Sequence, residues 1–186
     1  MKQYSDVCVT SANAVKIVKA LPNKYIFFIP DRNLAHYVAS QVPEKEFVYN
    51  TGYCPVHEKV QVEEILEAKR MHPEAEVLTH PECAEAVLKV SDYIGSTSGI
   101  IRYAEESPKQ EFIICTEKGV RYELEKRNPG KKFYFTKTEP VCHDMKKVTL
   151  EKILQVLETG ENEVFVTDEL RENSGRPLEK MLELAR

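Results

Sequence analysis

The sequence of 186 residues predicts an α/β fold made of repeated three-layer α/β/α units with short parallel sheets. Three observations predict it. Short apolar runs alternate with longer stretches in which apolar residues recur at helical spacing. The connections between these runs are short, as in units that alternate strand and helix. The order of motifs also repeats after about 86 residues, which indicates two copies of one supersecondary unit.

The strands are expected where apolar runs are too short to form helices. These runs occupy residues 25–29, 46–49, 76–79, 92–95, 110–115, 132–135 and 163–166. Helix-like stretches separate them, so parallel pairing with helices on both faces is expected.

The helices are expected where apolar residues recur every three or four positions. These segments are residues 12–21, 33–42, 60–71, 84–90, 99–106, 117–127, 150–157 and 178–185. Polar side chains stand at several of their starts, where N-caps belong. The candidate caps are Thr10, Ser11, Asp31, Ser96 and Thr97.

The internal repeat has sequence anchors at both of its ends. Ser5-Asp6-Val7 returns as Ser91-Asp92-Tyr93, and Cys54-Pro55-Val56-His57 returns as Cys142-His143. The first copy has no counterpart of residues 60–83, so it starts partway through its unit. We therefore expect an incomplete repeat at 1–56, a full repeat at 57–143 and a helical and strand extension at 144–186.

Charge and hydropathy exclude two classes of function. The chain has 26 Lys and Arg residues against 30 Asp and Glu, which argues against a general nucleic-acid surface. Its apolar runs are far shorter than a membrane-spanning helix needs, and the polar first residues do not resemble a signal peptide. We expect a cytoplasmic protein.

Five cysteines form an odd count without the density of a disulfide scaffold. Cys8 and Cys115 lie in apolar surroundings and are expected in the core, and Cys83 is ambiguous. Cys54 and Cys142 instead follow the last strand of their copies, in loops beside Pro and His. Loop thiolates suit an iron–sulfur cluster or zinc, and plain buried thiols are the alternative.

Candidate ligand-binding side chains also follow strands, on the side where open parallel sheets bind ligands. Ser11 and Thr97 occupy matching strand-to-helix junctions that could hold a carboxylate or phosphate, or could only cap helices. His80 and Glu82 end another strand. Glu82 there suits a general base or simply a helix start, and His80 could equally lie on the surface.

With these residues in place, the chain resembles the quinolinate synthase family, iron–sulfur enzymes of bacterial and archaeal NAD biosynthesis. The resemblance spans nearly the whole sequence. It is carried by Cys8-Val9-Thr10-Ser11-Ala12-Asn13-Ala14-Val15, Pro30-Asp31-Arg32-Asn33-Leu34, Gly52-Tyr53-Cys54-Pro55-Val56-His57, His80-Pro81-Glu82-Cys83, Tyr93-Ile94-Gly95-Ser96-Thr97, Thr116-Glu117-Lys118-Gly119, and Cys142 with Met145-Lys146-Lys147.

The resemblance implies three similar domains around a pseudo-threefold axis, each giving one cysteine to a 4Fe–4S cluster that keeps one iron open for substrate. It implies a transferase that condenses iminoaspartate with dihydroxyacetone phosphate to quinolinate. The matching positions are Cys54 and Cys142 for the cluster, Ser11, Thr97 and His57 for substrate, and His80 and Glu82 for catalysis, with Glu82 as acid/base. Cys8, Cys83 and Cys115 match positions that are not ligands.

The chain also departs from the family pattern. It lacks counterparts of the first domain, with its cluster cysteine, and of the opening strand of the second domain. Tyr122 and Asp144 stand where the family often has His and Asn. An incomplete gene, a split enzyme completed by a separate chain, and a decayed relative all fit this pattern. We expect a quinolinate synthase that is inactive without the missing domain; the alternatives are a non-catalytic metal- or anion-binding module and a stable domain pair with no retained site.

Overall fold

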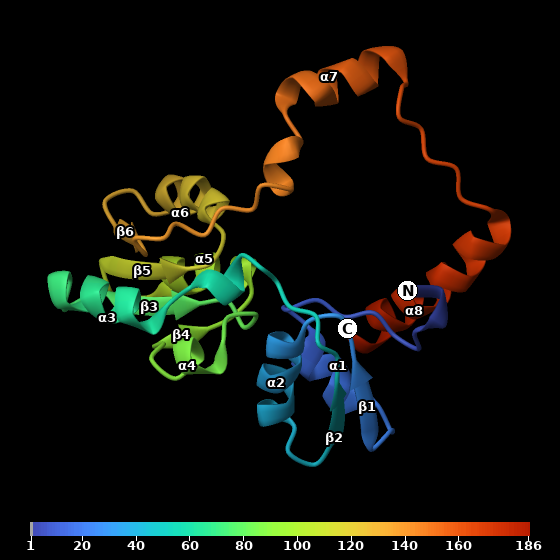
Figure 1. The fold of residues 1–186 in the computed structure, drawn as a ribbon, viewed down its shortest axis with the longest axis horizontal. Coiled ribbons are helices and arrows are strands. Elements are labelled where there is room, and N and C mark those ends of the chain that lie inside the picture. The colour runs from blue at the N-terminus through green and yellow to red at the C-terminus, as the bar shows by residue number, and fades with distance from the viewer. Residues whose placement is uncertain (1) are drawn as a thin grey trace. The chain divides into compact units, whose positions relative to one another are not determined.

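The computed structural model describes residues 2–186, which form two compact units (Figure 1). The larger unit is Thr10–Val141, and the smaller combines the residues up to Val9 with Cys142–Arg186. Each unit is described by itself. The three sequence segments predicted as domains remain a prediction.

The larger unit alternates helices with strands and contains two parallel sheets. One sheet pairs β1 with β2, and the other has the strand order β4-β3-β5-β6. The strands are β1 (Tyr25–Phe28), β2 (Glu46–Tyr49), β3 (Glu76–Thr79), β4 (Tyr93–Ile94), β5 (Glu111–Cys115) and β6 (Lys132–Phe135). The helices are α1 (Ala14–Ala20), α2 (Arg32–Gln41), α3 (Val62–Met71), α4 (Glu85–Leu88), α5 (Thr97–Glu106) and α6 (Arg121–Arg127), with short 3-10 helices η2 (His57–Lys59) and η3 (Lys118–Val120). The predicted α/β class with short parallel sheets is confirmed.

Helices cover both faces of the four-stranded sheet, so its central strands are buried on both sides. In β5, Ile113 belongs to a cluster with Ile65 of α3, whereas Phe112 and Ile114 belong to a second cluster with Ile100 of α5. Successive residues of a strand point to opposite faces, so these clusters form two separate layers. Each fully buried side chain of this size stabilises the fold by about 1.5–3 kcal/mol.

The pairing in the two sheets follows the spacing of the sequence repeat. Tyr25 pairs with Glu46 in the small sheet, and Glu111 pairs with Lys132 in the larger one, 86 residues further along the chain at both positions. The pseudo-threefold arrangement of such units remains a prediction.

The two-stranded sheet has one well-covered face. Ile26 and Phe28 are buried, while the alternate residues Tyr25 and Phe27 are 67% and 66% exposed. Helix α2 begins at an Asp31 cap, whose carboxylate accepts the N–H of Leu34. The N-cap predicted at Asp31 is therefore confirmed, as is the one at Ser96 of α5.

The smaller unit joins segments far apart in the sequence. It contains η1 (Lys2–Tyr4), η4 (Met145–Lys147), α7 (Leu150–Thr159) and α8 (Asp168–Leu184). Helix α8 packs against η1, and the N–H of Cys8 donates to the carbonyl of Pro177 at 3.0 Å. Across the described residues, every helix falls short of the length or apolar character that crossing a bilayer would require.

Several predicted elements were wrong in type or extent. Residues 163–166 form no strand: Val164 and Phe165 are 81% and 84% exposed, and a strand needs a paired neighbour. Helix α8 begins ten residues before the predicted start at 178, across Gly175 and Pro177, which normally indicate helix ends.

Smaller differences affect helix ends. The helix expected at 12–21 begins at Ala14 after an Asn13 cap, so Thr10 and Ser11 lie in the preceding turn. Thr97 is the first residue of α5 and not its cap. The segment 84–90 is helical only over Glu85–Leu88, and 117–127 divides into η3 and α6.

Candidate active site and metal-binding group

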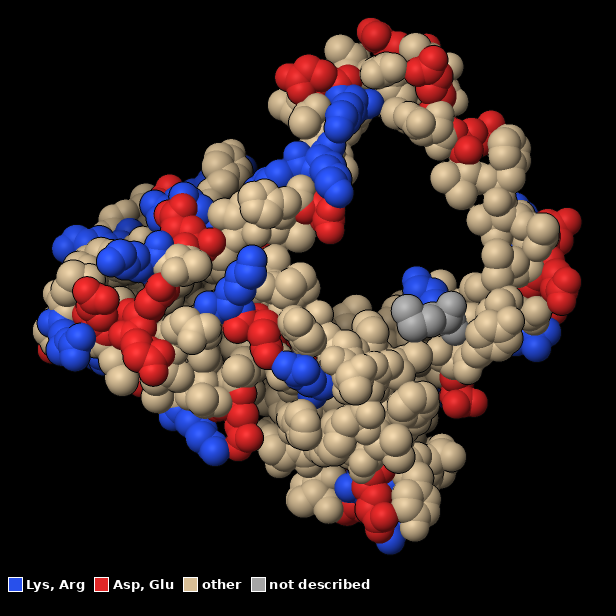
Figure 2. Space-filling view, in the orientation of Figure 1, with Lys and Arg blue, Asp and Glu red and all other residues tan. Residues whose placement is uncertain are grey.

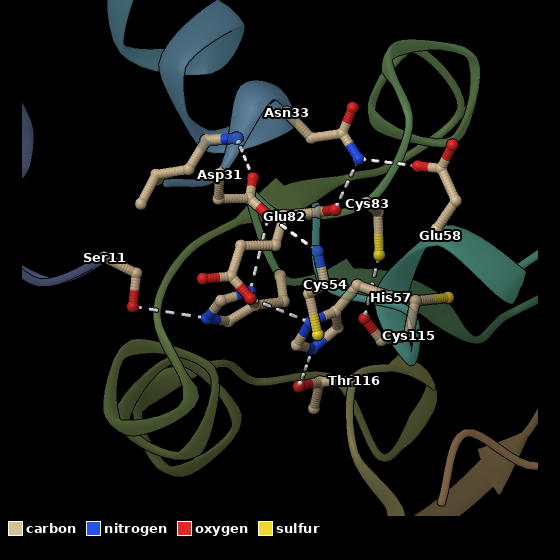
Figure 3. A network of polar contacts seen from close by, with 12 residues as sticks. Ser11, Asp31, Asn33, Cys54, His57, Glu58, Glu82, Cys83, Cys115 and Thr116 are labelled. Atoms are coloured by element: carbon tan, nitrogen blue, oxygen red, sulfur yellow. Dashed lines mark hydrogen bonds and ion pairs between the residues drawn. The ribbon is translucent and has the colours of Figure 1, made fainter. Parts of the chain in front are cut away.

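A network of polar side chains lies where several strands of the larger unit end (Figure 3). His80 follows β3 and Thr116 follows β5, so the parallel sheet brings both to the same edge. Cys54 and His57 enter this network from the loop after β2, and Ser11 from the turn before α1. This is the edge at which sequence analysis placed the candidate ligand-binding residues.

His57 is buried and bonded at both ring nitrogens. Its Nδ1 lies 3.0 Å from Oε2 of Glu82, and its Nε2 lies 3.0 Å from Oγ1 of Thr116. Burial favours the neutral ring, but hydrogen bonding and charge at Cys54 and then Glu82 outweigh it and raise the pKa of His57 to about 9. His57 is therefore an imidazolium at neutral pH, and both of its ring N–H groups donate hydrogen bonds.

His80 has the opposite protonation state. The backbone N–H of Glu82 points at Nδ1 of His80 at 3.3 Å, so Nδ1 accepts and the ring proton is on Nε2. That Nε2–H lies 3.2 Å from Oγ of Ser11 and donates to it. Burial and the charge on His57 lower the pKa of His80 to about 4, which keeps the ring neutral.

Cys54 offers its sulfur to this cluster. One ligand atom each from Cys54, His57 and Glu82 lies within 4.8 Å of the others. Burial raises the pKa of the Cys54 thiol, but hydrogen bonds from the His57 side chain and from the backbone of His57 and Val56 shift the pKa below its ordinary value overall. A thiolate, the form that binds metals, is thus favoured.

The donor set suits a metal that accepts sulfur, nitrogen and oxygen, such as zinc or iron. Both nitrogens of His57 already bond to protein groups, so ligation by His57 would cost one of those bonds. Cys54 is therefore the ligand that this group offers most readily, and a loop thiolate fits an iron–sulfur cluster.

A second set of polar residues braces the network, and sequence analysis gave it no functional role. The side-chain amide of Asn33 donates to Glu58 at 2.7 Å and to the carbonyl of Glu82 at 3.0 Å. Arg32 donates to the other oxygen of Glu58 at 2.5 Å. The sequence signals were the two family motifs that contain Arg32 and Asn33 and that begin at Thr116, which also directly follows a strand.

The remaining predicted residues have different surroundings. Among the residues that the structure describes, Thr97 is exposed at the start of α5, and the hydrogen bonds of the network do not include it. Cys142 is half-buried in the smaller unit, where its carbonyl accepts the N–H of Lys146. That Cys142 shares a metal centre with Cys54 therefore remains a prediction.

The other cysteines are mostly core residues. Cys83 and Cys115 are buried in one apolar cluster, where burial raises the pKa of each thiol. Cys8 was expected in the core but is only half-buried, because it lies in the segment that packs on α8 and not in a sheet.

The chain is similar to known proteins over nearly its whole length. A family model described as "Quinolinate synthetase A protein" matches residues 1–183. A quinolinate synthase of Fusobacterium nucleatum subsp. nucleatum is 51% identical over 187 residues, and one of Clostridioides difficile is 47% identical over 185. A quinolinate synthase of Aquifex aeolicus is 43% identical over 190 residues.

These matches cover all of this chain but only part of each relative: 61% of the first two and 59% of the third. The chain thus spans about three fifths of the length of the curated relatives it matches. Because the family model matches residues 1–183 and a named relative is 51% identical, the chain belongs to the quinolinate synthetase A protein family.

Proposed function

We propose that this chain supplies part of the active site of a quinolinate synthase, a transferase that condenses iminoaspartate with dihydroxyacetone phosphate to form quinolinate for NAD. One observation carries the proposal: Ser11, Cys54, His57, His80 and Glu82 form one connected network at the carboxyl ends of parallel strands. The named relatives support the same reaction.

The proposed cofactor is a 4Fe–4S cluster with Cys54 and Cys142 as two of its ligands. A third thiolate would come from a domain outside this chain, carried by a separate polypeptide or by a longer form of the protein. When bound, the cluster would supply an open iron that acts as a Lewis acid on a substrate oxygen.

Ser11 is proposed to bind an anionic group of the substrate. Its oxygen accepts the Nε2–H of His80, so its own hydroxyl proton is directed elsewhere and can be donated to a carboxylate or phosphate oxygen. His80 stays neutral and serves to orient Ser11. Thr97, at the start of α5, is proposed as a second anchor for substrate charge.

Glu82 is proposed as the group that moves protons. Burial raises the pKa of Glu82, but the hydrogen bond from His57 and the positive charge of the same ring bring the pKa below its ordinary value. The carboxylate is therefore ionised at neutral pH and able to accept a proton from a substrate carbon or oxygen. His57 holds Oε2 of Glu82 in place, which limits the orientations of the carboxylate.

The test is anaerobic reconstitution with iron and sulfide, alone and with a polypeptide covering the part of the Fusobacterium relative that this chain does not match. We expect a cluster absorbance and quinolinate formation in the mixture. Folded components that form neither cluster nor quinolinate together would reject the proposal. Phosphate binding without turnover would instead indicate a non-catalytic anion-binding module.

Variants sharpen this test in the same mixture. Cys54→Ser should abolish cluster retention, whereas Cys8→Ser, in the segment packed on α8, should retain it. Glu82→Gln should retain the cluster but lower turnover by at least about a hundredfold, the usual contribution of general acid–base catalysis. Exposed Glu85→Gln is its matched control and should leave turnover unchanged.

A further inference from the structure

The carboxylate of Asp31 joins two parts of the larger unit. Asp31 lies between β1 and α2 and is only 6% exposed. Its Oδ1 accepts the backbone N–H of Leu34 at 2.7 Å, which is the ordinary N-cap bond of α2. Its Oδ2 accepts the backbone N–H of Cys54, also at 2.7 Å. Capping explains the first bond but not the second.

The loop that carries Cys54 is attached to the same junction at other points. The N–H of Arg32 donates to the carbonyl of Gly52 at 2.8 Å, and the Arg32 guanidinium lies over the ring of Tyr53, 4.5 Å from its centroid. A methyl group on Gly52 would lie 2.5 Å from the carbonyl oxygen of Pro30. The loop therefore approaches the junction as closely as its backbone allows.

An equivalent connection occurs in the second copy of the repeat. The N–H of Lys118 donates to the carbonyl of Pro140 at 2.8 Å, and Pro140 precedes Cys142 by two residues, as Gly52 precedes Cys54. Glu117, at the position of Asp31, accepts the N–H of Gly119 at 2.6 Å. The attachment of the loop ahead of the cysteine to a strand-to-helix junction is thus a repeated feature.

We propose that Asp31 is a positioning residue for Cys54: its second carboxylate oxygen fixes the Cys54 backbone and so directs the sulfur toward His57 and Glu82. A cysteine side chain has one torsion between its backbone and its sulfur, so a fixed backbone leaves only a few staggered sulfur positions. Hydrogen bonds to an ionised acceptor are also stronger than neutral ones. This inference concerns the geometry of the chain and does not depend on the proposed cluster or reaction.

Asp31→Ser separates positioning from capping. Serine is as good an N-cap as aspartate, but it has a single side-chain oxygen and cannot hold Leu34 and Cys54 together. Ser96→Ala is the matched control. Ser96 caps α5, in the second copy of the repeat, by accepting the N–H of Gly99 at 3.1 Å. The Ser96→Ala substitution removes a helix cap but leaves every hydrogen bond to the loop that carries Cys54 in place.

The readout is amide hydrogen exchange of the ¹⁵N-labelled full chain, together with the couplings that report the Cys54 side-chain torsion. In Asp31→Ser we expect the Cys54 amide to exchange at least about tenfold faster, the Leu34 amide to change by less than about twofold, and the torsion to average over rotamers. Ser96→Ala should leave the Cys54 amide unchanged.

Unchanged exchange and an unchanged torsion at Cys54 in Asp31→Ser would overturn the proposal. Should that variant fail to fold, Asp31→Asn keeps the size of the side chain but only one acceptor oxygen. Either the Leu34 or the Cys54 amide should then lose its protection, and full protection of both would equally overturn the proposal. Failure of cluster assembly in any variant would bear on the proposed function alone.

Discussion

At the scale of single residues, the main feature is a stacked pair of histidines, of which one is positively charged and the other neutral. The rings of His57 and His80 lie 4.3 Å apart between centroids. Cys54 and Glu82 hold the proton on His57, while burial and the neighbouring cation keep His80 neutral. One pair of identical side chains thus provides both a cation that holds a carboxylate and a neutral donor that orients a hydroxyl.

Glu82→Gln should lower the pKa of His57 from about 9, because glutamine can still accept a hydrogen bond but carries no charge. The measurement is an NMR titration of the His57 ring in the metal-free chain. Glu85→Gln is the control, since Glu85 is an exposed partner of Lys89. A His57 titration that does not move in Glu82→Gln would contradict the assigned ion pair.

The thiol of Cys54 should be alkylated at lower pH than an ordinary cysteine. Its pKa is lowered by hydrogen bonds from His57 and Val56 despite burial, so the rate should reach its midpoint below pH 9, the ordinary thiol value. His57→Gln should move this midpoint upward. His72→Gln should not, because His72 stacks on Tyr134. Iodoacetamide labelling, followed by mass spectrometry of the Cys54 peptide, measures both.

Most of this site was predictable because its residues stand beside recognisable strand ends. Cys54, His80 and Glu82 follow apolar runs, and parallel strands bring such positions together. His57 was expected in the site only from the family resemblance. The second bond of Asp31 and the contact of Thr116 with His57 were not predictable, because they join segments 23 and 59 residues apart. The residues next to each partner in the sequence give no signal for such long-range contacts.

At the scale of elements, the close approach of the cysteine loop to the β1–α2 junction requires a glycine. Gly52→Ala places a methyl group against the Pro30 carbonyl, so the loop or the junction must shift. We expect the free energy of unfolding of the larger unit to fall by about 1–3 kcal/mol, as for other overpacked sites. Urea unfolding, followed by amide exchange in α2, measures this change.

Gly175→Ala is the matched substitution with the opposite expectation. A methyl group at Gly175 meets open space in α8, and alanine favours a helix interior over glycine by about 1 kcal/mol. The smaller unit should therefore become more stable. Equal effects of the two substitutions would show that the contact at Pro30 is not what requires Gly52.

The elements that sequence predicted well are those whose apolar pattern matches their burial. The run predicted at 110–115 became β5 because Phe112 and its neighbours pack on both faces of a sheet. The equally apolar run at 163–166 lacks a paired strand, and apolar character alone does not form one. The start of α8 was missed because its first residues are polar and are followed by Gly175 and Pro177.

At the scale of the whole molecule, positively and negatively charged side chains are mixed and do not form separate patches on the face shown in Figure 2. There, Lys and Arg side chains are interspersed with Asp and Glu. A net charge of −4 agrees with this mixture. Electrostatic attraction to a polyanion would need clustered positive charge, and this face shows none.

The smaller unit should have one preferred site for limited proteolysis. Residues 163–166 are exposed and irregular, so a protease of broad specificity should cut there first. Helix α8 should then stay bound to the rest of the chain, because it packs against Lys2–Tyr4 and accepts the N–H of Cys8. Gel filtration of the nicked protein, with a urea-treated sample as control, checks this. Separate elution of α8 without urea would contradict the packing.

The pairing of Lys2–Tyr4 with α8 also has a consequence for synthesis on the ribosome. All of Thr10–Val141 can emerge and fold while α8 is still untranslated, since its sheets pair only strands within that span. The segment around Cys8 must wait, unpartnered, until translation has passed Pro177. During that interval the segment can bind a chaperone or associate with another molecule.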